Sequence, residues 1–154
     1  MDTIRIQNND FDLAQEYQLL RGLSATVGGV VTFSGLVRDF ERESSIESLS
    51  LQHYPGMTEN LLQEIIDQAN ARWNLIGITI IHRVGRLLPT DQIVFVGVAS
   101  EHRGEGFTAA QFLMDYLKAK ATFWKQVSQD GKQFWVDSKS SDADAAASWE
   151  SNEG

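Results

Sequence analysis

The sequence predicts one α+β domain with a mostly antiparallel or mixed sheet, because strand and helix signals interleave without strict βα alternation. Asp130-Gly131, inside the segment 125–136, is a typical hairpin turn between adjacent strands. The apolar run from Ile93 to Ala99 is typical of a strand that is covered on both faces. A chain of 154 residues is long enough for one core of this kind and short for two, so we predict a single domain over 1–154.

The predicted strands are rich in β-branched residues and end at turn residues, whereas the predicted helices repeat apolar residues at steps of three and four. Before Pro55, the predicted elements are an edge strand at 3–7, a helix at 12–23 and strands at 30–37 and 46–54. After Pro55, they are a helix at 58–73, strands at 78–85 and 92–100, a helix at 106–121 and the hairpin at 125–136.

The two longer helices differ in what their spacing indicates. Thr58 is the predicted N-cap of the first, which has the clearest apolar stripe. Lys118 and Lys120 border the stripe of the second on opposite sides, where the stripe consists of Phe107, Ala110, Met114, Leu117 and Ala121. Helical spacing does not distinguish the two lysines. A lysine beside an apolar stripe commonly packs its aliphatic chain against the stripe and keeps its ammonium group in water.

The C-terminal segment 138–154 is predicted to be an acidic, loosely held tail, with Trp149 as the residue that pins it. Residues 137–154 carry five acidic side chains and one basic one, hence a charge of -4. The remaining residues contribute the other half of the net charge of -8. Such an acidic balance argues against binding nucleic acid, which needs a basic surface along the phosphates.

Several other classes of function are disfavoured by what the sequence lacks. There is no basic, apolar N-terminal leader and no run of roughly 20 apolar residues, so we expect a cytoplasmic protein with no membrane span. Without cysteine the chain has no disulfide, thiolate nucleophile or cysteine-ligated metal, and any sulfur chemistry must use sulfur that a partner brings. His53 and His82 have no second histidine at ligand spacing, so neither a metal site nor a resident cofactor is predicted.

The segment VASEHRGEGFTAAQF, residues 98–112, places glycines between a predicted strand and a predicted helix, where exposed amides favour an anion. A dinucleotide site is disfavoured, because a hairpin occupies the place of the parallel strand that it needs. The segment also resembles the acetyl-CoA loop of GNAT N-acetyltransferases, although Glu101 stands where that family has Arg or Gln. A third alternative is a tight turn at Gly104 and Gly106 with solvated side chains around it.

Five blocks in the same order together resemble one family, the large catalytic subunit of molybdopterin synthase. The resemblance covers about residues 27–149. It is carried by VVTFSGLVR (30–38), LQHYPGMTE (51–59), IHRVGRLLPTDQIVFVGVASEHR (81–103), FLMDYLKAKATFWK (112–125) and WVDSKSSD (135–142). It implies an α/β-hammerhead-type fold with an additional antiparallel sheet.

The resemblance also implies a reaction and its partners. The family moves two sulfurs from the thiocarboxylated Gly-Gly C-terminus of a small ubiquitin-like subunit to cyclic pyranopterin monophosphate, which gives the dithiolene of molybdopterin. Two large subunits form a homodimer with one small subunit at each end. Such an enzyme needs no cysteine of its own.

By the same resemblance, the catalytic lysine falls on Lys118 and a second active-site lysine on Lys125. Arg38, His102 and Arg103 match positions that line the substrate and anion pocket, which the family shares across the dimer interface. Met114 and the Phe123-Trp124 pair are candidates for the wall of the channel that receives the small subunit's tail. The alternative is that these side chains only pack in the core.

Two features depart from the family pattern. Lys139 stands where an arginine is expected, and the loop after Arg38 is unusually acidic. Three classes of function therefore stay open at this point: sulfur transfer, a GNAT-like acetyltransferase, and a non-catalytic dimeric scaffold whose lysines hold a partner's tail.

Overall fold

The computed structural model of the chain describes residues 1–38, 48–120, 123–129, 132–136 and 140–150. The helices within these residues are α1 (Leu13–Arg21), α2 (Met57–Arg72), α3 (Arg103–Lys120) and α4 (Ser140–Glu150). The strands are β1 (Asp2–Gln7), β2 (Gly29–Leu36), β3 (Ser48–His53), β4 (Leu75–Arg83), β5 (Gly85–Leu87), β6 (Gln92–Ser100), β7 (Phe123–Gln129) and β8 (Lys132–Val136).

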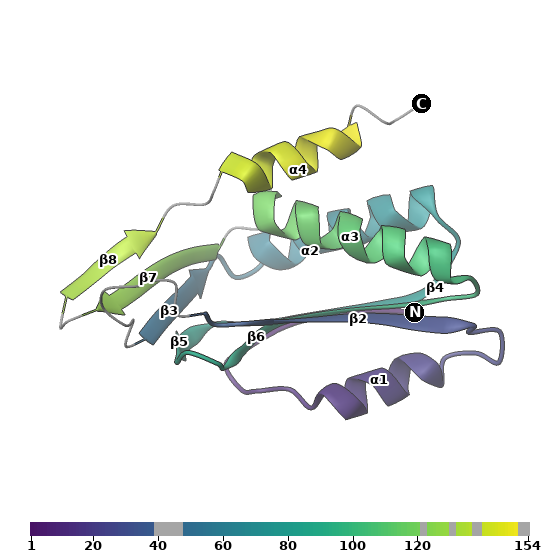
Figure 1. The fold of residues 1–154 in the computed structure, drawn as a ribbon, viewed down its shortest axis with the longest axis horizontal. Coiled ribbons are helices and arrows are strands. Elements are labelled where there is room, and N and C mark those ends of the chain that lie inside the picture. The colour runs from purple at the N-terminus through teal and green to yellow at the C-terminus, as the bar shows by residue number, and fades with distance from the viewer. Residues whose placement is uncertain (39–47, 121–122, 130–131, 137–139, 151–154) are drawn as a thin grey trace.

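The strands form two four-stranded sheets (Figure 1). Sheet A has the order β1-β4-β6-β2, in which β1 and β4 are parallel and the other pairs are antiparallel. Sheet B has the order β5-β3-β7-β8, and all of its pairs are antiparallel. The fold is therefore the predicted α+β class, with the mixed sheet and the additional antiparallel sheet that the family resemblance implies for the hammerhead-type fold.

Sheet A is covered on both faces, by α1 on one side and by α2 and α3 on the other (Figure 1). Successive side chains of β6 point to opposite faces of sheet A, so this strand contributes to the apolar core on each face. Val94, Val96 and Val98 belong to the larger core beneath α2 and α3, while Phe95 and Ala99 pack with Phe11 and Leu20 on the α1 side. The continuous apolar run in the sequence thus has the cause that was predicted for it, which is burial on two faces.

A smaller apolar cluster joins the two sheets. It consists of the buried residues Val37, Leu49, Leu51 and Leu87, with Val84 and Ile93 packed against it. These residues come from the end of β2, from β3 and from β5, so this cluster sets how sheet B meets sheet A.

Helix α2 begins two residues earlier than a Thr58 cap would allow. Gly56 is the N-cap at a φ of 85°, a left-handed conformation that glycine adopts without strain. The Glu59 carboxylate accepts a hydrogen bond from the Gly56 amide. Thr58 is instead buried inside the helix, and its hydroxyl donates to the Tyr54 carbonyl over 2.9 Å. The predicted cap was wrong by two residues because a glycine can cap without a side chain.

Helix α3 also begins earlier than predicted, at Arg103, and its buried side is rotated from the expected stripe. Phe107 is 63% exposed, whereas Ala109, Phe112 and Leu113 are fully buried.

The residues of the C-terminal segment that the structure describes form α4, a helix packed on α3, rather than a loosely held tail (Figure 1). None of the helices in the described ranges is long and apolar enough to cross a membrane.

Candidate active site

Arg38 and Lys118 lie at the same end of sheet A. Strand β6 ends beside the start of β2, and Gly106 near the start of α3 packs there against Val31. From this contact α3 runs along the sheet toward sheet B, in the same direction as β2 (Figure 1). From this contact, Lys118 is twelve residues along the helix, or about 18 Å. Arg38 is seven residues along the strand direction, or about 23 Å. Both side chains are exposed, so two cations stand at the end of sheet A that faces sheet B.

Lys125 is brought to the same end by the chain itself. Strand β7 follows α3 directly, and its backbone pairs Lys125 with Leu51 of β3 and with Val136 of β8. The side chain of Lys125 lies outside the described residues, and so do those of Phe123 and Trp124.

His102 and Arg103 stand at the opposite end of α3. Arg103 is the first residue of the helix, fifteen residues before Lys118 and about 22 Å from it along the axis. Both side chains are exposed, and the Glu101 carboxylate lies near the His102 ring, with 3.9 Å between the His102 Nε2 and the Glu101 Oε1. A single copy of the chain therefore does not bring these two residues to the lysines.

The structure distinguishes the two lysines that sequence spacing left equivalent. Lys120 forms an ion pair with Glu150 of α4, with 3.6 Å between Nζ and Oε1. Lys118 is exposed and makes no ion pair within the part of the chain that the structure describes. Met114 lies one helical turn before Lys118 on the same side of α3 and packs against the main core with part of its surface accessible.

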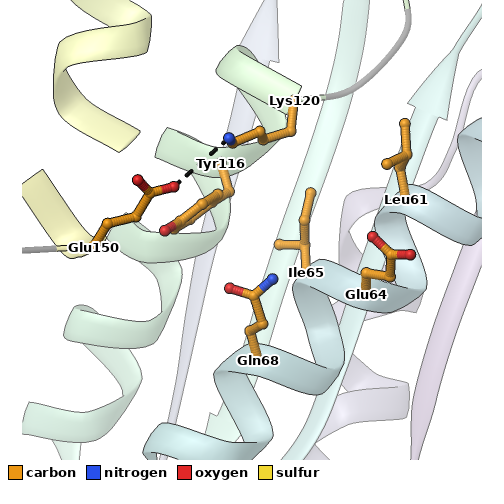
Figure 2. Close-up of a pocket in the computed structure, with 7 residues that line it drawn as sticks. All are labelled: Leu61, Glu64, Ile65, Gln68, Tyr116, Lys120 and Glu150. Atoms are coloured by element: carbon orange, nitrogen blue, oxygen red, sulfur yellow. Dashed lines mark ion pairs between the residues drawn. The ribbon is translucent and has the colours of Figure 1, made fainter. Parts of the chain in front are cut away.

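Lys120, not Lys118, lines a pocket of about 420 Å³ between α2, α3 and α4 (Figure 2). The lining residues are Leu61, Glu64, Ile65, Gln68, Tyr116, Lys120 and Glu150. Two carboxylates and one ammonium give this lining a formal charge of -1, which does not suit a phosphate. The pocket is therefore not the substrate and anion pocket that the family resemblance implies.

The glycines after β6 do not form a phosphate-binding loop, because both lie within the first turn of α3. A Cβ at position 106 would lie 2.9 Å from the Ser100 Oγ and 3.1 Å from the Val31 Cγ2. Glycine is thus needed there for close packing of the helix on the sheet. A Cβ at position 104 would meet nothing within 4 Å. The glycine at position 106 is therefore explained by packing and gives no support to an acetyl-CoA loop.

The comparisons with known proteins decide the family. The family described as "MoaE protein" matches residues 6–120, which is most of the chain. A "Molybdopterin synthase catalytic subunit" from Ralstonia nicotianae is 50% identical over 149 residues, which are 97% of this chain and 85% of that protein. The chain belongs to the MoaE family, the molybdopterin synthase catalytic subunits.

Solved structures of MoaE proteins have the same fold. The "Molybdopterin biosynthesis MoaE protein from Burkholderia ambifaria MC40-6" is 46% identical, with a TM-score of 0.84 over 97% of this chain and 99% of that one. A second structure, the "Protein-protein complex of subunit 1 and 2 of Molybdopterin-converting factor from Helicobacter pylori 26695", is 18% identical and has a TM-score of 0.74, which is a likeness of fold. It covers 89% of this chain and 92% of that one. Membership of the MoaE family confirms the enzyme class, which the resemblance had implied, in place of an acetyltransferase.

Some of the predicted MoaE features lie outside the described residues. These are the acidic loop after Arg38, within 39–47, and Lys139. Among the described residues, no group of three or more histidine, aspartate or glutamate side chains could hold a metal ion.

One local feature near Arg38 was missed in the sequence. The segment Leu88–Asp91 lies between two predicted strands, and in it Thr90 has a φ of 77°, an unusual value for a β-branched residue. The one available signal was the sequence Pro-Thr-Asp, in which proline begins a turn and the aspartate can accept a backbone N–H.

Proposed function

We propose that this chain transfers sulfur from the thiocarboxylated C-terminus of a small ubiquitin-like subunit to cyclic pyranopterin monophosphate, forming the dithiolene of molybdopterin. The observation that carries the proposal is the 50% identity over nearly the whole chain to a molybdopterin synthase catalytic subunit. The absence of cysteine from the sequence agrees with it, because the transferred sulfur arrives on the partner.

In each cycle, the thiocarboxylate sulfur attacks a side-chain carbon of the pterin and displaces an oxygen substituent of that carbon, which takes up a proton and leaves. A thioester then links the small subunit to the substrate. Water hydrolyses the acyl–sulfur bond, which leaves the sulfur on the pterin and releases the tail as a carboxylate. Two cycles deliver two sulfurs. We assign Lys118 the catalytic role, in proton transfer to the leaving group or in stabilising the acyl intermediate, with Lys125 as the second active-site lysine.

Arg38, His102 and Arg103 are assigned to the anionic groups of the substrate, and Met114 to the wall of the channel beside Lys118. A guanidinium can bind a phosphate with two parallel hydrogen bonds. Each charge-assisted bond is worth roughly 1.5–3 kcal/mol. Two or three of them, after desolvation, would approach the roughly 8 kcal/mol of a micromolar complex.

The distance along α3 supports a homodimeric site. A substrate of small-molecule size cannot reach both Lys118 and Arg103 of one copy across about 22 Å of helix. A second copy, related by two-fold symmetry, can supply His102 and Arg103 from its own α3. Strand β2 is one of the two edge strands of sheet A and carries the exposed side chains Phe33 and Leu36, which are suited to burial against another chain. The cytoplasmic location stays a prediction.

Reconstitution tests the proposal. Purified chain is mixed with cyclic pyranopterin monophosphate and with a small subunit that ends in a Gly-Gly thiocarboxylate, and molybdopterin is measured as its oxidised fluorescent derivative. Product should form with the thiocarboxylate and not with the same subunit ending in a carboxylate. If the small subunit binds but no product appears, the chain is the non-catalytic scaffold that the sequence left open.

A further inference from the structure

We propose that the turn Leu88–Asp91 is a positioning device for Arg38, which it aims through the backbone of Val37. This inference rests on the proposed function, because it assigns a role to the side chain that binds the substrate anion. Neither Thr90 nor Asp91 is assigned any contact with substrate.

The first support is a pair of reciprocal hydrogen bonds. The amide of Val37 donates to the carbonyl of Asp91, and the amide of Thr90 donates to the carbonyl of Val37, each over 2.8 Å. Both backbone groups of Val37 are thus held by one turn. The Val37 side chain is 4% exposed and belongs to the apolar cluster between the sheets, so this residue is fixed on three sides.

The second support is the way the turn is closed. The Asp91 carboxylate accepts a hydrogen bond from the Leu88 amide over 2.8 Å, and the Asp91 amide donates to the Leu88 carbonyl over 3.0 Å. Thr90 between them is held in the left-handed region, at a φ of 77°. A β-branched residue persists there only where its surroundings hold it, and such residues cluster at functional sites.

The third support is the irregularity of β2 at this point. Its pairing with β6 shifts between Gly35 and Leu36, the two residues before Val37. The extra residue is Ile93 of β6, which has no partner on β2, and a bulge of this kind disrupts the ladder locally and increases its twist. Strand β2 therefore ends its regular pairing at Leu36. The next residue, Val37, is bonded to the turn, and Arg38 follows it, exposed at the end of sheet A that carries Lys118.

The consequence for function is specific. Arg38 is a long side chain whose attachment point decides which volume its guanidinium can sample. If the turn loosens, Arg38 remains present and charged but spends less time in the geometry that binds the anion, so substrate affinity falls while the chemical step is unchanged.

A double-mutant cycle tests this role. Asp91→Ala removes the carboxylate that closes the turn and should raise KM for cyclic pyranopterin monophosphate about tenfold, with kcat within about twofold. In an Arg38→Ala background, the same change should alter KM by less than about twofold, because the side chain being positioned is gone. Asp91→Asn, whose amide oxygen can still accept from Leu88, should keep KM within about threefold of wild type.

Asp12→Ala is the matched control. Asp12 is also an aspartate that accepts one backbone N–H, from Gln15 over 3.2 Å, but it caps α1 on the far side of sheet A. Asp12→Ala should leave KM unchanged in the wild-type and in the Arg38→Ala background. All variants are assayed well below their melting temperatures, and Asp91→Leu, which has a similar size and no acceptor, replaces Asp91→Ala in the cycle if the alanine variant does not fold.

The outcomes separate this inference from the proposed function. If wild-type protein forms no molybdopterin, the proposed function is wrong and the positioning role falls with it. If wild type is active but Asp91→Ala raises KM equally in both backgrounds, or not at all, the turn does not position Arg38 and the proposed function stands.

Discussion

The indole nitrogen of Trp149 donates a hydrogen bond to the carboxylate of Asp115, with 2.7 Å between Nε1 and Oδ2. The same indole stands edge-on to Phe112 and to Trp73, with ring centroids 5.4 and 5.8 Å apart. Its backbone carbonyl accepts a hydrogen bond from Arg72 over 3.3 Å. One residue of α4 therefore contacts both α2 and α3, and it fixes the C-terminal segment against the helix that carries Lys118.

Trp149→Ala should lower the free energy of unfolding by about 2–4 kcal/mol, because it removes a partly buried aromatic ring and one of the two side-chain hydrogen bonds that Asp115 accepts, the other coming from Gln111. Trp149→Phe keeps a ring and loses only the hydrogen bond, so it should cost about 1 kcal/mol. Urea titrations followed by circular dichroism measure both. Glu150→Gln, which removes only the exposed pair with Lys120, is the control and should stay within about 0.5 kcal/mol. Equal effects of all three changes would show that α4 is not held by Trp149.

Alanine at the two glycines of α3 should have opposite effects. Gly104→Ala adds a methyl group in open space and should stabilise the protein by about 0.5–1 kcal/mol, as expected for glycine in a helix. Gly106→Ala should destabilise it by about 1–3 kcal/mol, because its Cβ would displace the Ser100 hydroxyl that donates to the His102 carbonyl over 2.7 Å. Melting temperatures of the two variants test this pair, and a stabilised Gly106→Ala would refute the packing role.

Lys118→Ala should lower kcat for molybdopterin formation at least about 100-fold, the usual scale for loss of a group that transfers a proton. Lys120→Ala should leave kcat within about threefold, because the Lys120 ammonium is already paired with Glu150 and is half exposed. Single-turnover assays with excess small subunit distinguish the chemical step from binding. The reverse pattern would move the catalytic role to Lys120.

Coexpression of two inactive variants should restore activity if the site is shared between copies. In a mixed dimer, the Lys118→Ala protomer still supplies Arg103 and the Arg103→Ala protomer still supplies Lys118. One of the two shared sites therefore contains both intact residues, and the other contains neither. Random association would then give about a quarter of wild-type activity. If both residues served the same protomer's site, no mixed dimer would contain an intact site. Activity of the mixture, compared with either variant alone, decides between the two arrangements.

Much of the fold could be predicted because its elements have strong local patterns. The apolar run of β6 and the apolar stripe of α2 match their burial directly, since periodicity reports which faces are covered. The start of α3 could not be predicted in this way. Gly104 and Gly106 weaken a helix locally, and only the tight packing of Gly106 on Ser100 and Val31 makes glycine acceptable there.

The C-terminal helix was missed, and helical spacing left the two lysines equivalent, for a related reason. Small acidic residues in 140–150 gave no stripe, and the helix depends on contacts that Ala146 and Trp149 make with residues more than 30 positions away. The ion pair between Lys120 and Glu150 exists only because α4 packs beside α3. Sequence spacing could therefore place both lysines at the edge of a stripe but could not show which one was already paired.

The parallel pairing of β1 with β4 has a consequence for synthesis on the ribosome. Asp2 pairs with Ile78, a separation of 78 − 2 = 76 residues, so β1 is made long before its partner. At roughly 5–20 residues per second, the wait is about 4–15 s. During that interval, the nascent N-terminal strand has no native neighbour in sheet A, so Ile4 and Ile6 stay uncovered until β4 is made.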